Sequence, residues 1–195
     1  KTSGRRYEYV DMEYYPLYRF GYGLSYTSFE YSGLKVQEKP NGNVTVEATV
    51  KNIGNRAGDE VAQLYVTDMY ASVKTRIMEL KDFTRIHLNP GKSKTVSFEL
   101  TPYDLSLLND RMDRVVEKGE FKICVGGMSP DYKANNEIKH SVSYSDKKKG
   151  VSGILNYTHE FGADFALSVS KVEENLLKDQ KTVWVSVKNG GTLMD

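Results

Sequence analysis

The side chains that could do chemistry in this chain are its carboxylates, its three histidines and one cysteine. His87, His140 and His159 lie far apart and form no close pair of the HxH or HExxH kind, so the sequence predicts no metal site. Cys124 is the only cysteine, which excludes an intramolecular disulfide, and no histidine lies near it to activate a thiolate. The 26 aspartates and glutamates fit solvent-facing strand positions and turns. We therefore expect no catalytic residue, metal ion or cofactor in this chain.

A second group of residues with a chemical use is aromatic and lies at the start of the chain. Ten of the 22 aromatic residues fall within the first 31 positions. Flat rings stack on sugars, and tyrosine also suits an interface because its apolar ring carries a hydroxyl that can reach a polar partner. We favour a connector packed against a neighbouring domain over a sugar-stacking platform. The candidate interface or sugar-stacking residues are Tyr14, Tyr15, Tyr18, Phe20 and Tyr22.

The composition argues against two classes of partner. Lysine and arginine number 27 against 26 aspartates and glutamates, and a net charge of +1 offers no general attraction to nucleic acid. The chain is 39% hydrophobic and 27% charged, and no uncharged apolar run approaches the roughly 20 residues that cross a bilayer. We expect neither nucleic acid nor a membrane as a partner.

The elements that must position these residues are predicted to be short strands. Four segments alternate between apolar and polar residues and are bounded by turn residues; they are residues 44–51, 60–66, 95–100 and 120–125. In the last segment Phe121, Ile123 and Val125 share the inner face, and Cys124 lies on the opposite face. Residues 101–108 predict one short helical turn between strands. This pattern indicates an all-β, immunoglobulin-like antiparallel sandwich.

One segment carries a specific resemblance to a known family. Residues 16–29, PLYRFGYGLSYTSF, resemble the junction that leads into the C-terminal fibronectin type III-like domain of family 3 glycoside hydrolases, of the β-glucosidase and β-xylosidase type. Three later blocks, residues 52–66, 80–91 and 119–127, agree in order and spacing. Asp82, which precedes Phe83, departs from the glycine that is usual at this position in the family. Aspartate tolerates turn conformations better than most residues, so the backbone can still adopt the required conformation. The resemblance covers about residues 14–145 and implies a fibronectin type III-like sandwich.

The resemblance implies a role without catalysis in this chain. The family cleaves β-linked sugars by a retaining mechanism, which needs a nucleophilic carboxylate and an acid/base carboxylate about 5 Å apart. In the family these residues lie upstream, and the nucleophile has a Ser-Asp-Trp context, whereas the only tryptophan here, Trp184, follows Val183. We expect a non-catalytic accessory domain that stabilises the catalytic domains of a retaining β-glycosidase and shapes substrate access.

Two further expectations accompany this function. The alternative to an accessory domain is a carbohydrate-binding module, which would hold an oligo- or polysaccharide on the exposed aromatics of the N-terminal segment. For either function we expect a periplasmic or extracellular location. The sugar and the linkage on which the parent enzyme acts are not predicted by this sequence.

The chain is expected to have four parts. Residues 1–28 are a tyrosine-rich connector from an upstream catalytic domain, 29–145 the sandwich, 146–155 a linker, and 156–195 an incomplete second immunoglobulin-like β unit. The linker contains three consecutive lysines, which are typical of a solvated connection.

The second unit is indicated by an internal repeat. Residues 46–54, VEATVKNIG, align with residues 183–191, VWVSVKNGG. Two strands alone rarely bury enough apolar area to be stable in water. We therefore expect residues 156–195 to pair with the first sandwich or, by self-association, with another copy of the chain.

Overall fold

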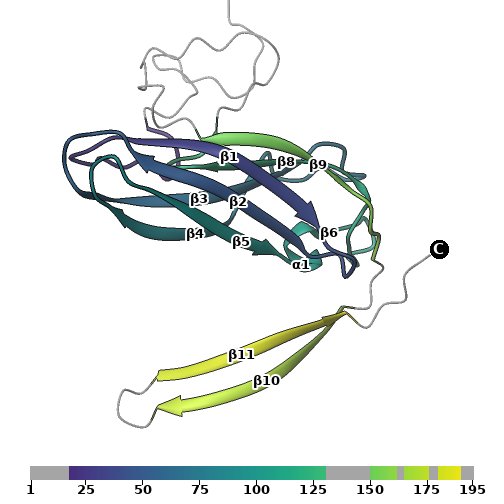
Figure 1. Cartoon of the computed structure of the whole chain (residues 1–195). Coiled ribbons are helices and arrows are strands. Elements are labelled where there is room, and N and C mark those ends of the chain that lie inside the picture. Colours follow the sequence, from purple (N-terminus) through teal and green to yellow (C-terminus); the bar gives the residue numbers. More distant parts are fainter. Residues whose placement is uncertain (1–17, 131–149, 162–164, 176–179, 190–195) are drawn as a thin grey trace, which may run out of the picture.

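The computed structural model describes residues 18–130, 150–161, 165–175 and 180–189 (Figure 1). The strands are β1 (Phe29–Glu38), β2 (Val44–Asn52), β3 (Gly58–Asp68), β4 (Glu79–Leu88), β5 (Ser93–Leu100), β6 (Leu107–Leu108), β7 (Arg114–Val115), β8 (Gly119–Gly126), β9 (Val151–Tyr157), β10 (Phe165–Asn175) and β11 (Gln180–Asn189). A helical turn, α1, spans Pro102–Leu105. Among the described residues no helix has the length and apolar character needed to cross a membrane.

Two antiparallel sheets form the body of the molecule. One sheet has the strand order β1-β2-β5, and the other has the order β4-β3-β8-β9 (Figure 1). The short strands β6 and β7 pair as a small separate ribbon. Two antiparallel sheets that pack face to face over one core define a β-sandwich, so the predicted all-β fold is confirmed.

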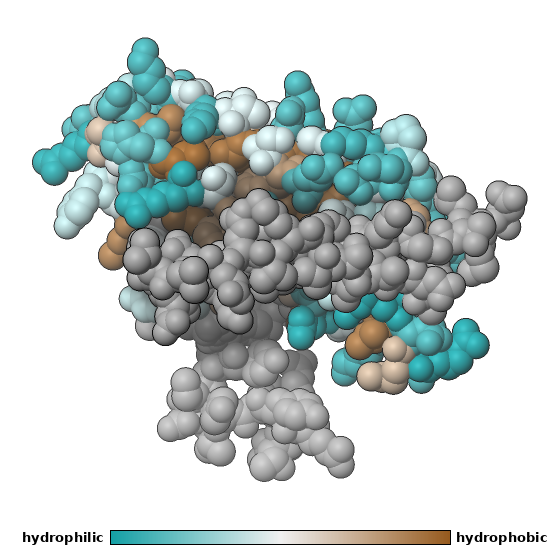
Figure 2. Space-filling view, turned by 90° about the horizontal axis from the view of Figure 1, so that it is seen from below, coloured by the Kyte–Doolittle hydropathy of each residue, from teal (hydrophilic) through white to brown (hydrophobic). Residues whose placement is uncertain are grey.

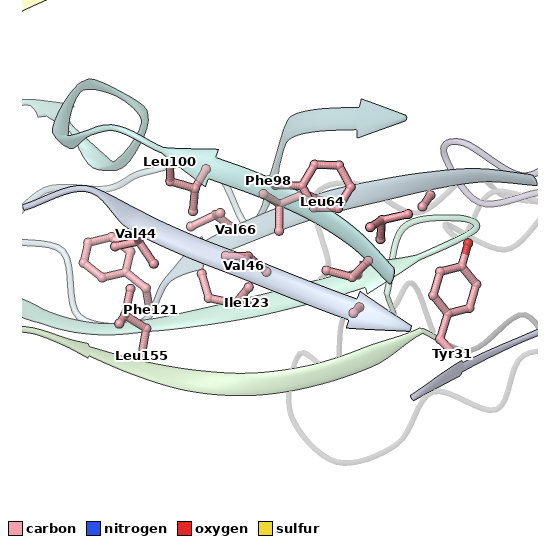
Figure 3. Close-up of a cluster of buried hydrophobic side chains, with 14 of the residues drawn as sticks. Tyr31, Val44, Val46, Leu64, Val66, Phe98, Leu100, Phe121, Ile123 and Leu155 are labelled. Carbon is pink, nitrogen blue, oxygen red and sulfur yellow. The ribbon is translucent and has the colours of Figure 1, made fainter. Parts of the chain in front are cut away.

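The core lies between the sheets and follows the alternation seen in the sequence. Val44, Val46 and Val50 of β2 are fully buried, because every second residue of a strand points to the same side. Phe121 and Ile123 of β8 are also buried, and Figure 3 shows labelled side chains of both sheets gathered in one cluster. Burial of apolar surface stabilises such a cluster by roughly 25 cal/mol per Å² removed from water. The four segments predicted as strands all lie in strands.

The predicted helical turn is confirmed as α1. The backbone N–H of Thr101 donates to the Asp104 carboxylate at 2.7 Å, and the Thr101 hydroxyl donates to the same oxygen at 2.7 Å. Pro102 begins the turn, where its missing N–H has no helical partner to lose. Leu105 is buried and anchors the turn on the sandwich.

Cys124 lies on the face of β8 opposite the core, as its place in the alternation predicts. It is nevertheless buried, and its neighbours in register are Tyr65 of β3 on one side and Ser152 of β9 on the other. Burial raises the pKa of the Cys124 thiol above its ordinary value. A buried thiol with a raised pKa is a poor nucleophile, so this residue has a packing role.

The predicted linker at residues 146–155 needs correction, because residues 151–155 belong to strand β9. Val151–Tyr157 pair with β8 as the outermost strand of the four-stranded sheet. Leu155 and Tyr157 are buried, and the Tyr157 hydroxyl donates to the carbonyl oxygen of Gly42 at 2.8 Å. The alternating burial of Leu155 and Tyr157 is the physical reason for the correction, since it is the pattern of a sheet strand.

The boundary of the second unit also moves. Phe161, which lies within the predicted second unit at 156–195, is buried in the core of the first sandwich. Its backbone exchanges two hydrogen bonds with Val116, at 3.0 and 3.1 Å. The first sandwich therefore extends to Phe161 instead of ending at residue 145.

Strands β10 and β11 form a two-stranded antiparallel hairpin (Figure 1). Its pairing runs from Phe165 opposite Asn189 to Asn175 opposite Gln180. Of the region 156–195, residues 156 and 157 pair with the first sandwich through β9, whereas β10 and β11 pair with each other.

Candidate functional site

Residues 18–28, which precede β1, are fastened to the outer face of the four-stranded sheet. Gln63 and Tyr65 project from β3 on the side opposite the core residue Leu64. The Gln63 side-chain amide donates to the carbonyl oxygen of Gly21 at 3.0 Å, and the Tyr65 hydroxyl donates to Gln63 Oε1 at 2.5 Å. Both side chains are buried, so their polar atoms are paired where water is excluded.

Two more contacts hold the same segment. The backbone N–H of Ser129 donates to the carbonyl oxygen of Phe20 at 2.9 Å. The Thr27 hydroxyl donates to Asn52 Oδ1 at 2.7 Å at the end of β2. Burial raises the pKa of Tyr65 to about 12, so its hydroxyl remains a donor at physiological pH. The path of residues 18–28 is thus fixed at both ends.

Gly21 is required by this fastening for two reasons. Its φ of +75° lies in the left-handed region that side chains disfavour. A Cβ at this position would lie 1.9 Å from Oε1 of Gln63, which is far inside van der Waals contact. Any larger residue at position 21 therefore displaces either the segment or Gln63.

The fastened segment presents aromatic rings to solvent. Tyr18 is 60% exposed and Phe20 is 68% exposed, while Tyr22 is half-buried. The rings of Tyr18 and Tyr22 stack on each other with their centroids 5.2 Å apart. Tyr14 and Tyr15, the other two candidates, lie outside the described residues. Of the five candidates, the structure therefore brings three together on one segment.

Two apolar residues of the sheet itself lie on the same outer face. Phe83 of β4 pairs in register with Gln63 and is 64% exposed, and Val61 is also exposed. We call Tyr18, Phe20, Val61 and Phe83 the outer-face patch. Figure 2 shows more generally that hydrophobic residues reach the surface among hydrophilic ones on the side seen from below. A rigid, exposed aromatic surface is the type of surface that proteins use for contact with a partner.

The charged residues beside the patch are arranged as surface ion pairs. Asp59 accepts hydrogen bonds from His87 and Arg85, and these bonds hold the pKa of Asp59 below its usual value. On the other sheet, hydrogen bonds from Asn43 and Lys39 lower the pKa of Glu99 of β5 in the same way. A general acid needs a raised pKa, so neither carboxylate suits acid catalysis.

Asp68 has a pKa shifted in the opposite direction. Burial, and then the negative charge of Glu117, raise the pKa of Asp68, while the backbone N–H of Tyr70 donates to its carboxylate at 3.1 Å. Asp68 lines a depression together with Arg76 and Lys81, so this depression carries both negative and positive side chains. Within the described ranges, no cluster of three or more histidine, cysteine, aspartate or glutamate side chains could hold a metal ion.

The residues that fasten the segment were not among the candidates named from sequence. Gln63 and Tyr65 occupy the solvent side of a predicted strand, where polar residues are ordinary. One signal of a contact surface on this face was present in the sequence. Phe83 is an aromatic residue at a position where alternation places the side chain in solvent.

A large part of the chain matches known proteins. Residues 60–129 match the family model of the fibronectin type III-like domain. The putative β-xylosidase of Formosa agariphila is 45% identical over 128 residues, which cover 64% of this chain and 17% of that protein. The periplasmic β-glucosidase of Salmonella typhimurium is 40% identical over 121 residues, covering 60% of this chain and 16% of that protein. The chain thus contains a fibronectin type III-like domain.

Solved structures show the same relationship. β-Glucosidase 3B from Thermotoga neapolitana, determined in complex with α-D-glucose, superposes with a TM-score of 0.62 and 33% identity. The match covers 76% of this chain and 18% of that protein. The domain therefore corresponds to the C-terminal fibronectin type III-like region of family 3 β-glucosidases and β-xylosidases, and the resemblance noted in the sequence is confirmed. The chain spans about a fifth of the length of the relatives it matches.

Proposed function

We propose that this chain is a non-catalytic accessory part of a retaining β-glycosidase, and that the outer-face patch packs against the catalytic part of the same polypeptide. In the relatives, the matched region belongs to much longer enzyme chains. The observation that carries the proposal is that the buried Gln63 holds the segment with the exposed Phe20 on the same sheet face as the exposed Phe83. A surface that is held in place before binding loses less conformational entropy on contact.

The segment's direction supports a partner within the same polypeptide. Residues 18–28 lead from the outer face, where Gly21 bonds to Gln63, into β1. A catalytic region joined through this segment would have a high effective concentration at the patch. The accessory part would then stabilise the catalytic region and shape access to its substrate.

A carbohydrate-binding module is the second candidate, because Tyr18 and Phe20 present exposed rings. Sugar platforms need open ring faces on which pyranose C–H groups pack. The mutual stacking of Tyr18 and Tyr22 covers one face of each ring, which favours the interface over the platform. We further propose a periplasmic or extracellular location, supported by the name of the Salmonella typhimurium relative.

The test uses Phe83→Ser in the natural-length polypeptide and in the 195-residue chain. We expect no change in the melting temperature of the short chain, because Phe83 is exposed there. In the natural-length polypeptide we expect a loss of about 2 kcal/mol of stability, since the ring would be buried at the interface. Tyr70→Ser is the matched control, because Tyr70 is 75% exposed and lies on the loop after β3.

Two results would decide against the interface. The first is an equal, negligible effect of Phe83→Ser and Tyr70→Ser in the natural-length polypeptide. The second is saturable binding of β-linked oligosaccharides by the 195-residue chain that is abolished by Tyr18→Ala, which would support the carbohydrate-binding module instead.

A further inference from the structure

The β10–β11 hairpin has the same strand register as the β1–β2 hairpin. Each hairpin also has an irregularity before the paired lysine, between Ser32 and Lys35 in the first and between Val169 and Lys171 in the second. The first hairpin pairs Phe29 with Asn52, Tyr31 with Val50, Ser32 with Thr49, Lys35 with Glu47, and Val36 with Val46. In the same order, the second hairpin pairs Phe165 with Asn189, Leu167 with Val187, Ser168 with Ser186, Lys171 with Trp184, and Val172 with Val183.

Residue identities follow this register along both strands. The earlier alignment covers β2 and β11, and the register extends it to β1 and β10. The two hairpins have identical residues at ten equivalent positions, which are Phe29 and Phe165, Ser32 and Ser168, Lys35 and Lys171, Val36 and Val172, Glu38 and Glu174, Thr45 and Thr182, Val46 and Val183, Val50 and Val187, Lys51 and Lys188, and Asn52 and Asn189. A one-residue slip would move every side chain to the other face, so agreement along the hairpin indicates the same packing requirement.

In the first sandwich these positions serve to bind the opposing sheet. Phe29, Val46 and Val50 are buried in the core between the two sheets. Asn52 is fully buried, and its side-chain amide donates to the carbonyl oxygen of Leu88 in β4 at 2.9 Å. The retention of an asparagine at the position of Asn52 is informative, because a buried amide needs partners from a neighbouring strand.

We propose that Phe165–Asn189 are the first hairpin of a second fibronectin type III-like sandwich. The partner on which this hairpin packs is an antiparallel sheet equivalent to β4-β3-β8, because that is the sheet on which a hairpin of this register packs in the first sandwich. The partner is thus defined by its chemistry, a twisted sheet with an aliphatic and aromatic inner face. The accessory part of the polypeptide then consists of tandem modules.

The test exchanges the hairpins within the 195-residue chain. Residues 29–54 are replaced by residues 165–191, so that the second hairpin faces the opposing sheet of the first sandwich. We expect the exchanged chain to retain one cooperative thermal unfolding transition. Val187→Asp within the exchanged hairpin should abolish this transition, because its counterpart Val50 is buried. Ser186→Asp is the matched control and should retain it, because its counterpart Thr49 is only half-buried.

A second, smaller exchange is needed because one incompatible residue could prevent the first exchanged chain from folding. Leu167 replaces Tyr31 in the first exchange, and the Tyr31 hydroxyl donates to buried Glu60 at 2.9 Å. The smaller exchange therefore replaces only residues 46–54 by residues 183–191 and keeps Tyr31. A cooperative transition in either chain that is lost with Val187→Asp and kept with Ser186→Asp supports the proposal. Absence of a transition in both chains, or equal effects of the two substitutions, overturns it.

Discussion

The carbonyl oxygen of Gly21 accepts a hydrogen bond from the side-chain amide of Gln63 at 3.0 Å, which joins the segment before β1 to the middle of β3. Phe83 pairs with Gln63 in the sheet, so this bond holds the segment that carries Phe20 on the same face of the sheet as Phe83. The outer-face patch is therefore built from two distant parts of the sequence, and the buried Gln63 is one of the residues that hold the segment in place.

Substitution of Gly21 should weaken this fastening. We expect Gly21→Ala to lower the free energy of unfolding by about 1–3 kcal/mol, because a Cβ there meets Gln63 and φ is positive. Gly23→Ala is the control, since nothing lies within 4 Å of a Cβ at that position. Urea denaturation gives the free energies, and exchange of the Ser129 amide hydrogen reports the local bond. Equal destabilisation by both substitutions would contradict this explanation.

Asn52 should be among the polar residues that matter most for stability. Its amide donates to the carbonyl oxygens of Arg56 at 2.7 Å and Leu88 at 2.9 Å, and its Oδ1 accepts from Thr27. Asn52→Ala removes all three hydrogen bonds at a fully buried position and should cost about 3 kcal/mol in urea denaturation. Asn55→Ala, at an exposed position in the following turn, should change stability by less than about 0.5 kcal/mol. Similar losses for the two variants would refute the role of Asn52.

Acid should weaken the contact between β1 and the end of β9. Partial burial opposes ionisation of Glu38, but hydrogen bonds from His159 and Thr158 outweigh it and lower the pKa of Glu38 below 4.5. A group with a lowered folded-state pKa stabilises the protein above its unfolded pKa and loses this effect as the pH falls through the folded value.

The test of this pH dependence compares Glu38→Gln with the parent chain. We expect the variant to be less stable than the parent at pH 7, and the difference to shrink as the pH falls below 4.5. Glu30→Gln, at an exposed position of the same strand, controls for loss of a negative charge. A stability difference that is independent of pH would show that the charge of Glu38 is not involved.

The thiol of Cys124 should resist modification in the folded protein. Its burial and raised pKa both lower the concentration of accessible thiolate. We expect reaction with a disulfide reagent to be at least about tenfold slower in buffer than in denaturant. Rapid labelling of the native chain would contradict the burial of this residue.

The fold was largely predictable because its cause is local. Alternation at Val44, Val46 and Val50 reports which side of a strand is buried, and tertiary contacts do not alter that periodicity. Strand β9 was missed because the lysine run before it dominates the composition, whereas the burial of Leu155 and Tyr157 depends on the neighbouring β8.

The candidate site was predictable only in part. Aromatic density located the segment with Tyr18 and Phe20, because composition is visible without a fold. The contribution of Phe83 depends on the pairing of β3 with β4, and the role of Gln63 depends on a segment 42 residues away. Such contacts across the chain leave no periodic signal in the sequence.

Hydroxyl-radical footprinting can compare the 195-residue chain with the natural-length polypeptide that contains it. We expect Tyr18, Phe20 and Phe83 to be oxidised rapidly in the short chain, where they are exposed, and to be protected at least about fivefold in the long polypeptide. Tyr70, exposed on the loop after β3, should be oxidised equally in both. Equal oxidation of Phe20 and Phe83 in the two proteins would contradict the claim that the outer-face patch packs against the catalytic part.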